Sequence, residues 1–380
     1  MSSIPVSVLT GFLGSGKTTL LSKLLRHPGM AETAVVINEF GEVGLDHLLV
    51  EKSSENMVEL NSGCLCCTVR GDLVTTLRDL HIKRAKQEIP SFKRLVIETT
   101  GLADPAPILH TLMTDPMLAS YYRLDGVITV VDAVNGEATL DNHMEAVKQA
   151  AVADRLVLTK TDLVKDPASA RDLAALEARL AQLNPAAPRL RAVQGEIGPE
   201  VLFNAGLYDP ARKSPDVLRW LKEEAYADSH AHHDHHHHGH DHDHHHHGHD
   251  HHHNDVNRHD DHVRAFCIVL DRPIDAMAFS LFIEMLIATR GENLLRVKGI
   301  LNIADRPDQP AVIHGVQHVF HPVAWLETWP SEDRRSRIVF ITRDVPEEDI
   351  RQLIRALQVE AQPQDVPQGA PLGTPQGTPA

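Results

Sequence analysis

The sequence lacks the marks of an exported or membrane-spanning protein. No apolar run approaches the roughly 18 residues that a membrane-spanning helix needs. Residues 2–9 predict a short strand and show no basic region of the kind that opens a signal peptide. Cysteine is scarce, and three of the four cysteines fall within four positions. In the cytosol this spacing favours a metal or redox site over a structural disulfide. We therefore expect a cytoplasmic protein with no membrane segment.

An excess of basic residues is also missing. The chain has 37 Lys and Arg against 52 Asp and Glu, a formal net charge of −15, which argues against general binding of nucleic acid. Residues 228–262 hold eight Asp and one Arg, and so contribute −7 of this charge, together with 19 of the 27 histidines. The remainder is a mildly acidic chain of ordinary composition, and 380 residues are enough for two domains.

The N-terminal stretch carries a glycine-rich motif in the setting that a phosphate-binding loop requires. An apolar run leads into Gly-Phe-Leu-Gly-Ser-Gly-Lys-Thr at residues 11–18, and a helical pattern follows. The backbone N–H groups of such a loop, together with the positive end of the helix, attract a phosphate. Lys17 can reach the β- and γ-phosphates, and the Thr18 hydroxyl can ligate Mg²⁺. The alternative is a turn that binds nothing. The expected nucleotide-binding residues are Gly11, Gly14, Ser15, Gly16, Lys17, Thr18 and Thr19.

The second predicted strand, residues 33–40, runs into an acidic loop with two glycines at residues 38–46. It lies one strand–helix unit after the phosphate loop, where a nucleotide-dependent switch is ordered by the γ-phosphate and Mg²⁺. Asn38, Glu39 and Gly41 are the expected switch residues. An acidic surface loop is the alternative.

A further apolar run begins at Arg94 and ends in Glu98, three positions before Gly101. We expect Glu98 to lie near Mg²⁺ through a water molecule and the Gly101 N–H to face the γ-phosphate. With Lys17 and Thr18, these residues form the predicted catalytic group.

Residues 155–162, Arg-Leu-Val-Leu-Thr-Lys-Thr-Asp, predict a strand that ends in a base-reading motif. The motif matches Asn-Lys-x-Asp except that Thr159 stands in place of Asn, which removes an amide. The Asp162 carboxylate can accept hydrogen bonds from the N1–H and N2–H₂ groups of guanine, which adenine does not offer. Lys160 can pack along the plane of the base. The pattern therefore favours GTP over ATP.

The segment Gly-Cys-Leu-Cys-Cys at residues 63–67 is unusually dense in thiols. Thiolates are soft ligands that suit Zn²⁺ and other late transition metals. Cys64, Cys66 and Cys67 can converge if the segment forms a turn or the start of a helix. The fourth ligand would be water, an acid such as Glu42, or a client protein. Small buried residues in a tight turn and a redox role are the alternatives.

Residues 228–262 contain almost nothing hydrophobic to bury, so we expect them to be disordered. Neutral imidazoles and interleaved aspartates predict weak binding of several transition metals, without selection among them. A purification tag or a passive linker is the alternative. The histidines proposed as weak ligands are His235, His236, His237, His238, His244, His245, His246 and His247.

The order of predicted strands and helices defines two folded domains. Apolar strand patterns alternating with helices predict a doubly wound, mostly parallel α/β domain over residues 1–226, with its ligand at the carboxyl ends of the strands. A linker at 227–262 leads to a smaller α+β domain at 263–360, and a disordered tail covers 361–380.

The smaller domain is expected to contain strands at 266–270, 294–303, 311–319 and 337–341 and helices at 274–288 and 347–357. Cys267 lies within the first of these strands, which favours a core position over a metal ligand. His314, His318 and His321 alternate with apolar residues and are expected on one strand. A reach toward the nucleotide or metal region is the alternative to surface or core positions for these three histidines.

With these motifs together, residues 4–358 resemble the CobW-type P-loop GTPases, a group related to the nickel-inserting accessory GTPases of urease and hydrogenase. The cysteine motif beside a phosphate loop and the segment Arg-Gly-Glu…Leu-Arg-Val-Lys-Gly at 290–299 carry the resemblance. One departure concerns metal binding, because Ile37 stands where some relatives have a Glu. Relatives also show the Thr at position 159.

The resemblance implies a slow GTPase that uses GTP and Mg²⁺ and transfers Zn²⁺ to a client metalloprotein under nucleotide control. A homodimer is left open. Cobalt delivery to cobalamin synthesis is the second candidate, with Co²⁺ as the cargo. A metal buffer whose nucleotide site is only structural is an alternative of another class. A translation or signalling GTPase would leave the cysteine and histidine features unexplained.

Overall fold

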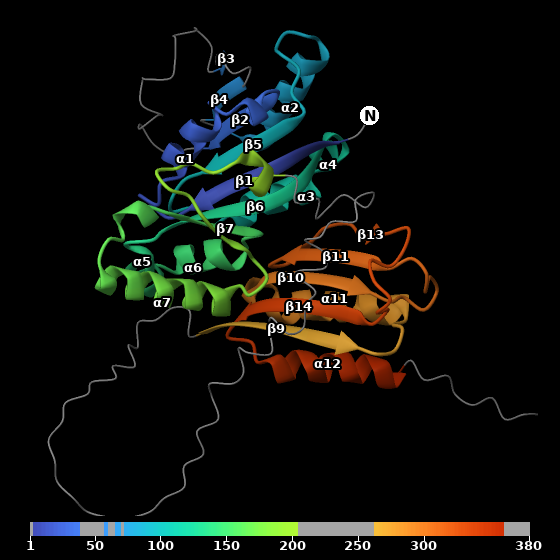
Figure 1. Ribbon diagram of the computed structural model, residues 1–380. Coiled ribbons are helices and arrows are strands. Elements are labelled where there is room, and N and C mark those ends of the chain that lie inside the picture. The colour runs from blue at the N-terminus through green and yellow to red at the C-terminus, as the bar shows by residue number, and fades with distance from the viewer. Residues whose placement is uncertain (1–2, 39–56, 60–64, 70–71, 204–261, 361–380) are drawn as a thin grey trace, which may run out of the picture.

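The computed structural model describes residues 3–38, 57–59, 65–69, 72–203 and 262–360, which form two packed domains with one sheet each (Figure 1). The predicted linker up to residue 261, the boundary at residue 226 and the predicted tail lie outside these ranges. Within them, no helix has the length and apolar content that a membrane crossing requires.

The first sheet has eight strands in the order β3-β4-β2-β5-β1-β6-β7-β8. Seven of them are parallel, and only β3 pairs antiparallel, with β4. Its central strands are buried on both faces, as expected for a parallel sheet whose strands are nearly continuous apolar runs. The strands are β1 (Ile4–Gly11), β2 (Thr33–Asn38), β3 (Met57–Glu59), β4 (Leu65–Val69), β5 (Arg94–Thr99), β6 (Tyr122–Asp132), β7 (Arg155–Thr159) and β8 (Arg189–Arg191).

Helices cover both faces of this sheet, so the doubly wound α/β prediction is confirmed. Aspartate caps begin three of the helices: Asp72, Asp115 and Asp166 each accept hydrogen bonds from the first-turn N–H groups. The helices are α1 (Lys17–Leu24), α2 (Leu73–Ala85), α3 (Ala106–Thr114), α4 (Pro116–Tyr121), α5 (Gly136–Asn142), α6 (Met144–Ala151), α7 (Pro167–Leu183) and α8 (Pro199–Leu202), with short 3₁₀ turns η1 (Pro28–Met30) and η2 (Thr161–Leu163).

The second domain is an antiparallel sheet in the order β12-β11-β10-β14-β9, with β13 paired to β11. One face packs on helices α11 and α12 through a core that includes Phe266, Phe282 and Phe340. Its elements are β9 (Val263–Leu270), α11 (Ala276–Arg290), η5 (Gly291–Asn293), β10 (Leu294–Leu301), β11 (Ala311–Val316), β12 (Val319–Phe320), β13 (Ala324–Trp325), β14 (Ser336–Arg343) and α12 (Glu347–Glu360).

The other face of this sheet packs on the first domain. Helix α3 contacts β11 and β12, α6 contacts β10, and α7 contacts β9. Alternation along β9 divides its side chains: Phe266 belongs to the core under the helices, whereas Ala265 and Cys267 join the apolar cluster of the first domain. Cys267 is therefore a buried core residue, as expected.

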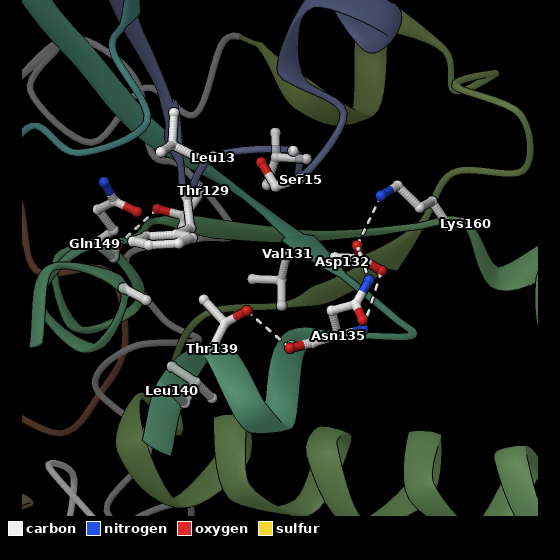
Figure 2. A pocket seen from close by; sticks show the side chains of 15 residues that line it. Leu13, Ser15, Thr129, Val131, Asp132, Asn135, Thr139, Leu140, Gln149 and Lys160 are labelled. Atoms are coloured by element: carbon white, nitrogen blue, oxygen red, sulfur yellow. Dashed lines mark hydrogen bonds and ion pairs between the residues drawn. The ribbon is translucent and has the colours of Figure 1, made fainter. Parts of the chain in front are cut away.

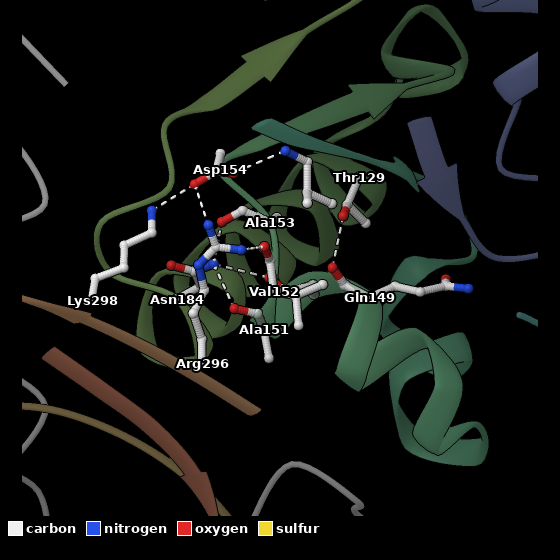
Figure 3. A network of polar contacts seen from close by, with 11 residues as sticks. Thr129, Gln149, Ala151, Val152, Ala153, Asp154, Asn184, Arg296 and Lys298 are labelled. Carbon is white, nitrogen blue, oxygen red and sulfur yellow. Dashed lines mark hydrogen bonds and ion pairs between the residues drawn. The ribbon is translucent and has the colours of Figure 1, made fainter. Parts of the chain in front are cut away.

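A buried ion cluster holds the two domains together (Figure 3). Asp154 lies just before β7, and its Oδ1 atom is 2.6 Å from Arg296 Nη2 and 2.5 Å from Lys298 Nζ, both on β10. Its Oδ2 accepts from the Val127 N–H at 2.8 Å, and Arg296 Nη1 also donates to the Val152 carbonyl. The side chains of the Asp, Arg and Lys are 2%, 5% and 8% exposed.

The ionisation of this cluster follows from its pairing. Burial alone would raise the pKa of Asp154, but the two cations outweigh burial and hold that pKa well below its ordinary value. His314, opposite Lys298 in the β10–β11 register, is fully buried. Burial, then Lys298 and Arg296, place its pKa well below the usual value, so it is neutral at pH 7.

Several expected boundaries were wrong, each for a local reason. The apolar pattern at residues 127–132 predicts a strand that begins at Val127. Strand β6 begins at Tyr122 instead, because Asp125, which interrupts the apolar pattern, is buried and accepts from Ser7 Oγ at 3.2 Å. Helix α11 begins after Asp275, which caps the Ala278 N–H at 2.8 Å, and it runs on to Arg290. The smaller differences are that β7 ends at 159, β10 at 301 and α12 at 360, and that β9 and β14 are longer than expected.

The expectation that three histidines share one strand was also wrong. Strand β11 ends at Val316, and Gln317 turns the chain with a φ of 52°. Only His314 lies on β11; His318 lies in the turn, and His321 follows β12.

Replacing Asp154 by Ala should lower the free energy of unfolding by about 3–5 kcal/mol, because two buried cations lose their counter-charge. Asp308→Ala removes an exposed ion pair: the side chains of Arg334 and Asp308 are 58% and 81% exposed. This variant should therefore lower the free energy of unfolding by less than about 1 kcal/mol. Urea unfolding followed by circular dichroism measures both. Equal losses in the two variants would contradict a stabilising role for the buried cluster.

Candidate functional site

The phosphate loop connects β1 to α1 and depends on glycine at three positions. Gly11, Gly14 and Gly16 have φ values of 142°, 70° and 94°, which side-chain-bearing residues rarely adopt. A Cβ atom on Gly11 would lie 2.3 Å from the Val130 carbonyl oxygen, so no larger residue fits there. Gly16 is the left-handed N-cap of α1 and has no side chain to cap the helix. The first N–H groups of α1 are therefore left to a ligand.

The two polar residues that open α1 both make contacts at the phosphate loop. Lys17 Nζ turns back into the loop and donates to the carbonyls of Gly11 at 2.8 Å and Phe12 at 3.2 Å. Thr18 Oγ1 donates to Glu98 Oε1 at 3.1 Å. A hydroxyl beside a buried carboxylate at the mouth of a phosphate loop fits the hard oxygen ligands that Mg²⁺ prefers.

Gly101 lies directly against the phosphate loop. A Cβ atom at this position would lie 2.6 Å from the Leu13 backbone nitrogen, so only glycine permits this approach. Thr99 Oγ1 donates to Thr10 Oγ1 at 2.8 Å and fixes the end of β5 to the end of β1. The structure therefore brings Lys17, Thr18, Glu98 and Gly101 together at the carboxyl edge of the sheet.

The substitution at Thr159 has a structural consequence that the sequence did not show. The Thr159 hydroxyl is buried and donates to the Ser15 carbonyl at 2.6 Å, with a longer contact of 3.3 Å to the Val131 carbonyl. It therefore ties the end of β7 to the phosphate loop. Strand β7 ends here, and Lys160 takes a left-handed conformation with a φ of 58°.

Lys160 and Asp162, the predicted base-reading residues, follow strand β7. Lys160 Nζ is 2.7 Å from Asp132 Oδ2. Burial alone would raise the pKa of Asp132, but hydrogen bonds from Lys160 and Asn135 outweigh burial and lower it. Asp162 Oδ1 is 3.5 Å from the Gln194 backbone nitrogen, so the loop after β8 approaches the predicted base reader.

The loop after β8 also contacts α1. A Cβ atom on Gly195 would lie 3.4 Å from the Thr19 carbonyl, and Glu196 pairs with Lys23 at 3.5 Å. Thr19 therefore lies at the junction of helix, loop and predicted base site.

A cavity of about 240 Å³ lies behind the phosphate loop, on the side of α5 and α6 (Figure 2). It is lined by the loop residues Phe12 to Ser15, the end of β6 and residues of the two helices. Two of its lining residues, Asp132 and Gln149, are buried polar groups that sequence reasoning missed. Asp132 could have been noticed, since it closes a buried strand, but Gln149 lies inside a helix with no motif around it.

The described part of the cysteine segment is a strand, not the expected turn or helix start. Cys66 and Cys67 are consecutive positions of β4, paired with Val35 and Val36 of β2. Through β2, Cys67 is level with Ile97 of β5, one residue before Glu98, at a separation of two strand spacings or about 10 Å. The pattern Leu-Cys-Cys-Thr-Val has the small, apolar and β-branched residues that strands favour.

Asn38 is the last residue of β2, but the remaining metal and switch residues lie outside the described ranges. Among the residues the structure does describe, no group of three or more His, Cys, Asp and Glu could hold a metal ion. The residues outside are Glu39, Gly41, Glu42, Cys64 and the histidines at 235–238 and 244–247.

The three histidines of the second domain lie at or near the domain interface. His314 is buried beside the ion cluster, and the ring of His318 contacts His110 of α3 edge-on at a centroid distance of 4.8 Å. His110 Nε2 is 2.8 Å from the Val316 carbonyl oxygen. The expectation of surface or core positions fits this arrangement better than a reach toward the phosphate loop.

Comparison with known proteins matches both domains. The model of the CobW/HypB/UreG nucleotide-binding domain matches residues 5–191, and that of the cobalamin synthesis protein cobW C-terminal domain matches residues 263–358. The zinc chaperone YjiA of Escherichia coli (strain K12) is 34% identical over 358 residues, which cover 94% of this chain and 100% of YjiA. The zinc chaperone CobW of Sinorhizobium sp is 28% identical over 386 residues, covering 93% of this chain and 97% of that protein.

The solved structures agree with the sequence matches. The crystal structure of Zn(II)-bound YjiA GTPase from E. coli aligns with a TM-score of 0.65 at 31% identity, over 94% of this chain and 99% of YjiA. A Zn(II)-bound triple mutant of YjiA aligns with a TM-score of 0.68 at 32% identity, with the same coverage. The phosphate loop, the parallel sheet and the second domain thus occur in one chain with the CobW architecture, and this chain belongs to the CobW/HypB/UreG family of nucleotide-binding proteins.

Proposed function

We propose that the chain is a GTP-hydrolysing metallochaperone that binds Zn²⁺ at its cysteine segment and transfers it to a client metalloprotein under nucleotide control. The observation that carries this proposal is the shared sheet. The phosphate loop and Glu98 lie at the carboxyl ends of the central strands β1 and β5. The strand that carries Cys66 and Cys67 lies two strands from the strand of Glu98. A nucleotide that moves the end of β2 would act directly on the strand paired with the cysteine strand β4, and one that moves the end of β5 would act on it through β2.

GTP and Mg²⁺ are the proposed cofactors. Gly11, Gly14, Ser15, Gly16 and Lys17 would hold the phosphates, with Thr18 and Glu98 on the magnesium ion. Thr159 supports this loop from behind. Asp162 and Lys160 would read guanine beside the loop that follows β8. The relative YjiA is named a GTPase, which agrees with this assignment.

Zinc is the proposed cargo because thiolates suit it and because similar proteins are named for it. Besides the two zinc chaperones, the zinc-regulated GTPase metalloprotein activator 1 of Dictyostelium discoideum is 33% identical over 257 residues, 58% of this chain and 52% of that protein. Its name supports a client metalloprotein as partner. Cobalt remains the second candidate, favoured by the description of the cobW C-terminal domain.

The proposed metal path begins at the histidine tract in the cytoplasm. Residues 228–262 would collect metal ions weakly and raise their concentration near Cys64, Cys66, Cys67 and Glu42. Nucleotide-dependent movement of Asn38, Glu39 and Gly41 would then change the ligand geometry. Metal binding and nucleotide binding must influence each other by the same factor.

Zinc affinity measured with GDP and with a non-hydrolysable GTP analogue tests this coupling. We expect the two dissociation constants to differ by about fivefold or more, and the difference to disappear in a Cys66→Ala/Cys67→Ala variant. Cys267→Ala is the matched control, because Cys267 is buried in the second domain and should leave the difference intact. Equal zinc affinities in both nucleotide states would contradict the proposal.

A chain without residues 230–253 separates the chaperone from a metal buffer in the same assay. A chaperone should keep the nucleotide-dependent part of its zinc affinity after the deletion. Loss of zinc binding, together with GTP hydrolysis that is unchanged and indifferent to zinc, would favour the buffer.

Base recognition can be tested by Asp162→Asn. The variant keeps one oxygen acceptor but replaces the other, needed to bind both N1–H and N2–H₂ of guanine, with an NH₂ donor that suits the C2 carbonyl of xanthine. GTP affinity should fall about tenfold or more, and XTP affinity should rise. Asp172→Asn, an exposed position on α7, is the control and should change neither. An unchanged preference for GTP in Asp162→Asn would refute the assignment.

A further inference from the structure

Gln149 of α6 makes an unusual set of hydrogen bonds for a helical glutamine. Its side chain is fully buried, and its Nε2 atom donates to the carbonyls of Gly101 at 3.2 Å and Ala103 at 2.9 Å. Both N–H groups of the amide therefore go to the segment that follows β5. Because two carbonyls face the amide, the nitrogen must point at them, which fixes its orientation.

This contact confines Gly101 between two parts of the first domain. On one side, Gly101 lies against the Leu13 backbone of the phosphate loop. On the other side, its carbonyl is bound by Gln149. The segment also closes on itself, since the Ala103 N–H donates to the Thr100 carbonyl at 3.2 Å. The direction of the backbone around Gly101 is thus set from behind by one side chain.

Helix α6 is itself held in place, so Gln149 is a rigid support. Thr129 Oγ1 of β6 donates to the Gln149 carbonyl at 2.7 Å. Lys148, the residue before Gln149, forms an ion pair at 2.8 Å with Asp104, which lies three residues after Gly101. Just after the helix, Arg296 of the second domain donates to the Val152 carbonyl (Figure 3).

The oxygen of the Gln149 amide indicates that this residue does more than fill space. Its Oε1 atom is buried without a hydrogen-bond partner in the described structure. Gln149 and Thr129 are both labelled at the wall of the cavity behind the phosphate loop (Figure 2). A buried amide with an unsatisfied oxygen costs stability compared with an apolar residue. The benefit that offsets this cost lies in the two bonds to the Gly101 segment.

We propose that Gln149 is a positioning residue for the γ-phosphate: it holds the Gly101 segment against the phosphate loop so that the Gly101 N–H faces the terminal phosphate of GTP. This inference rests on the proposed function as a GTPase. GDP has no γ-phosphate and does not use the Gly101 N–H. Loss of the Gln149 donors therefore weakens triphosphate binding selectively.

Gln149→Met tests the proposal, because methionine has a similar length and no donors. The dissociation constants for GDP and for a non-hydrolysable GTP analogue are measured on the full chain. We expect affinity for the analogue to fall about tenfold and affinity for GDP to stay within about twofold. Thr139→Ala, which alters the wall of the same cavity through a residue bonded only within its own helix, should change neither. An equal loss for both nucleotides, or no loss, would overturn the proposal.

Gln149→Glu provides a second test that a packing role would not pass. A buried carboxyl has a raised pKa, and only its protonated form can donate to a carbonyl. The selective defect should therefore be larger at pH 8 than at pH 6 in Gln149→Glu, whereas the defect of Gln149→Met should not depend on pH. A pH-independent Glu variant would count against positioning, even if the Met variant does not fold. Failure of the wild-type chain to bind the GTP analogue would instead refute the proposed function itself.

Discussion

The buried carboxylate of Asp154 determines how the rest of the molecule is assembled. A charge taken out of water is strongly unfavourable unless it is paired, and here both partners, Arg296 and Lys298, come from the other domain. Without the second domain Asp154 would lose both cations, and without the first domain Arg296 and Lys298 would lose this carboxylate. Docking of the domains satisfies all three, so the second domain is a fixed part of the first domain's surroundings.

The position of Asp154 gives this interaction a consequence for the nucleotide site. It lies three residues after α6, and Arg296 also binds the Val152 carbonyl just beyond that helix. Helix α6 in turn supplies Gln149 and Lys148 to the segment that follows Gly101. The second domain therefore braces the helix that supports the proposed γ-phosphate contact. The cysteine strand β4 lies on the opposite side of β1 from β7, the strand that Asp154 precedes.

Sequence reasoning predicted those parts of the protein whose information is local. The glycines of the phosphate loop, the run that ends in Glu98 and the alternation of strands and helices specify the first domain over short stretches. Contacts between residues that are far apart in the sequence could not be predicted in this way. Asp154 pairs with residues 142 and 144 positions away, and Gln149 bonds a loop 48 and 46 positions away, and neither has a motif. The segment at 290–299 was noticed only as a resemblance, and the structure explains its Arg and Lys as the partners of Asp154.

One local pattern was interpreted wrongly, and a second has a structural role that the sequence did not reveal. The cysteine motif was expected to form a turn or the start of a helix, which would let two or three sulfurs converge, but strand pairing with β2 determines the backbone at Cys66 and Cys67. Thr159 was treated as the loss of an amide, whereas its hydroxyl binds the Ser15 carbonyl across 144 positions. In both cases the residue type suggested a ligand contact, and tertiary contacts within the protein decided the conformation.

Helix α6 thus stands between the nucleotide and the second domain, and hydrogen exchange measures that connection most directly. Backbone exchange rates would be compared in the GDP state and in the state with a non-hydrolysable GTP analogue. The described contacts predict slower exchange with the analogue in residues 144–151 and in β10, which carries Arg296 and Lys298, as well as in the phosphate loop. A difference confined to residues 11–18 and 99–104, with α6 and β10 unchanged, would contradict a second domain that supports the nucleotide site.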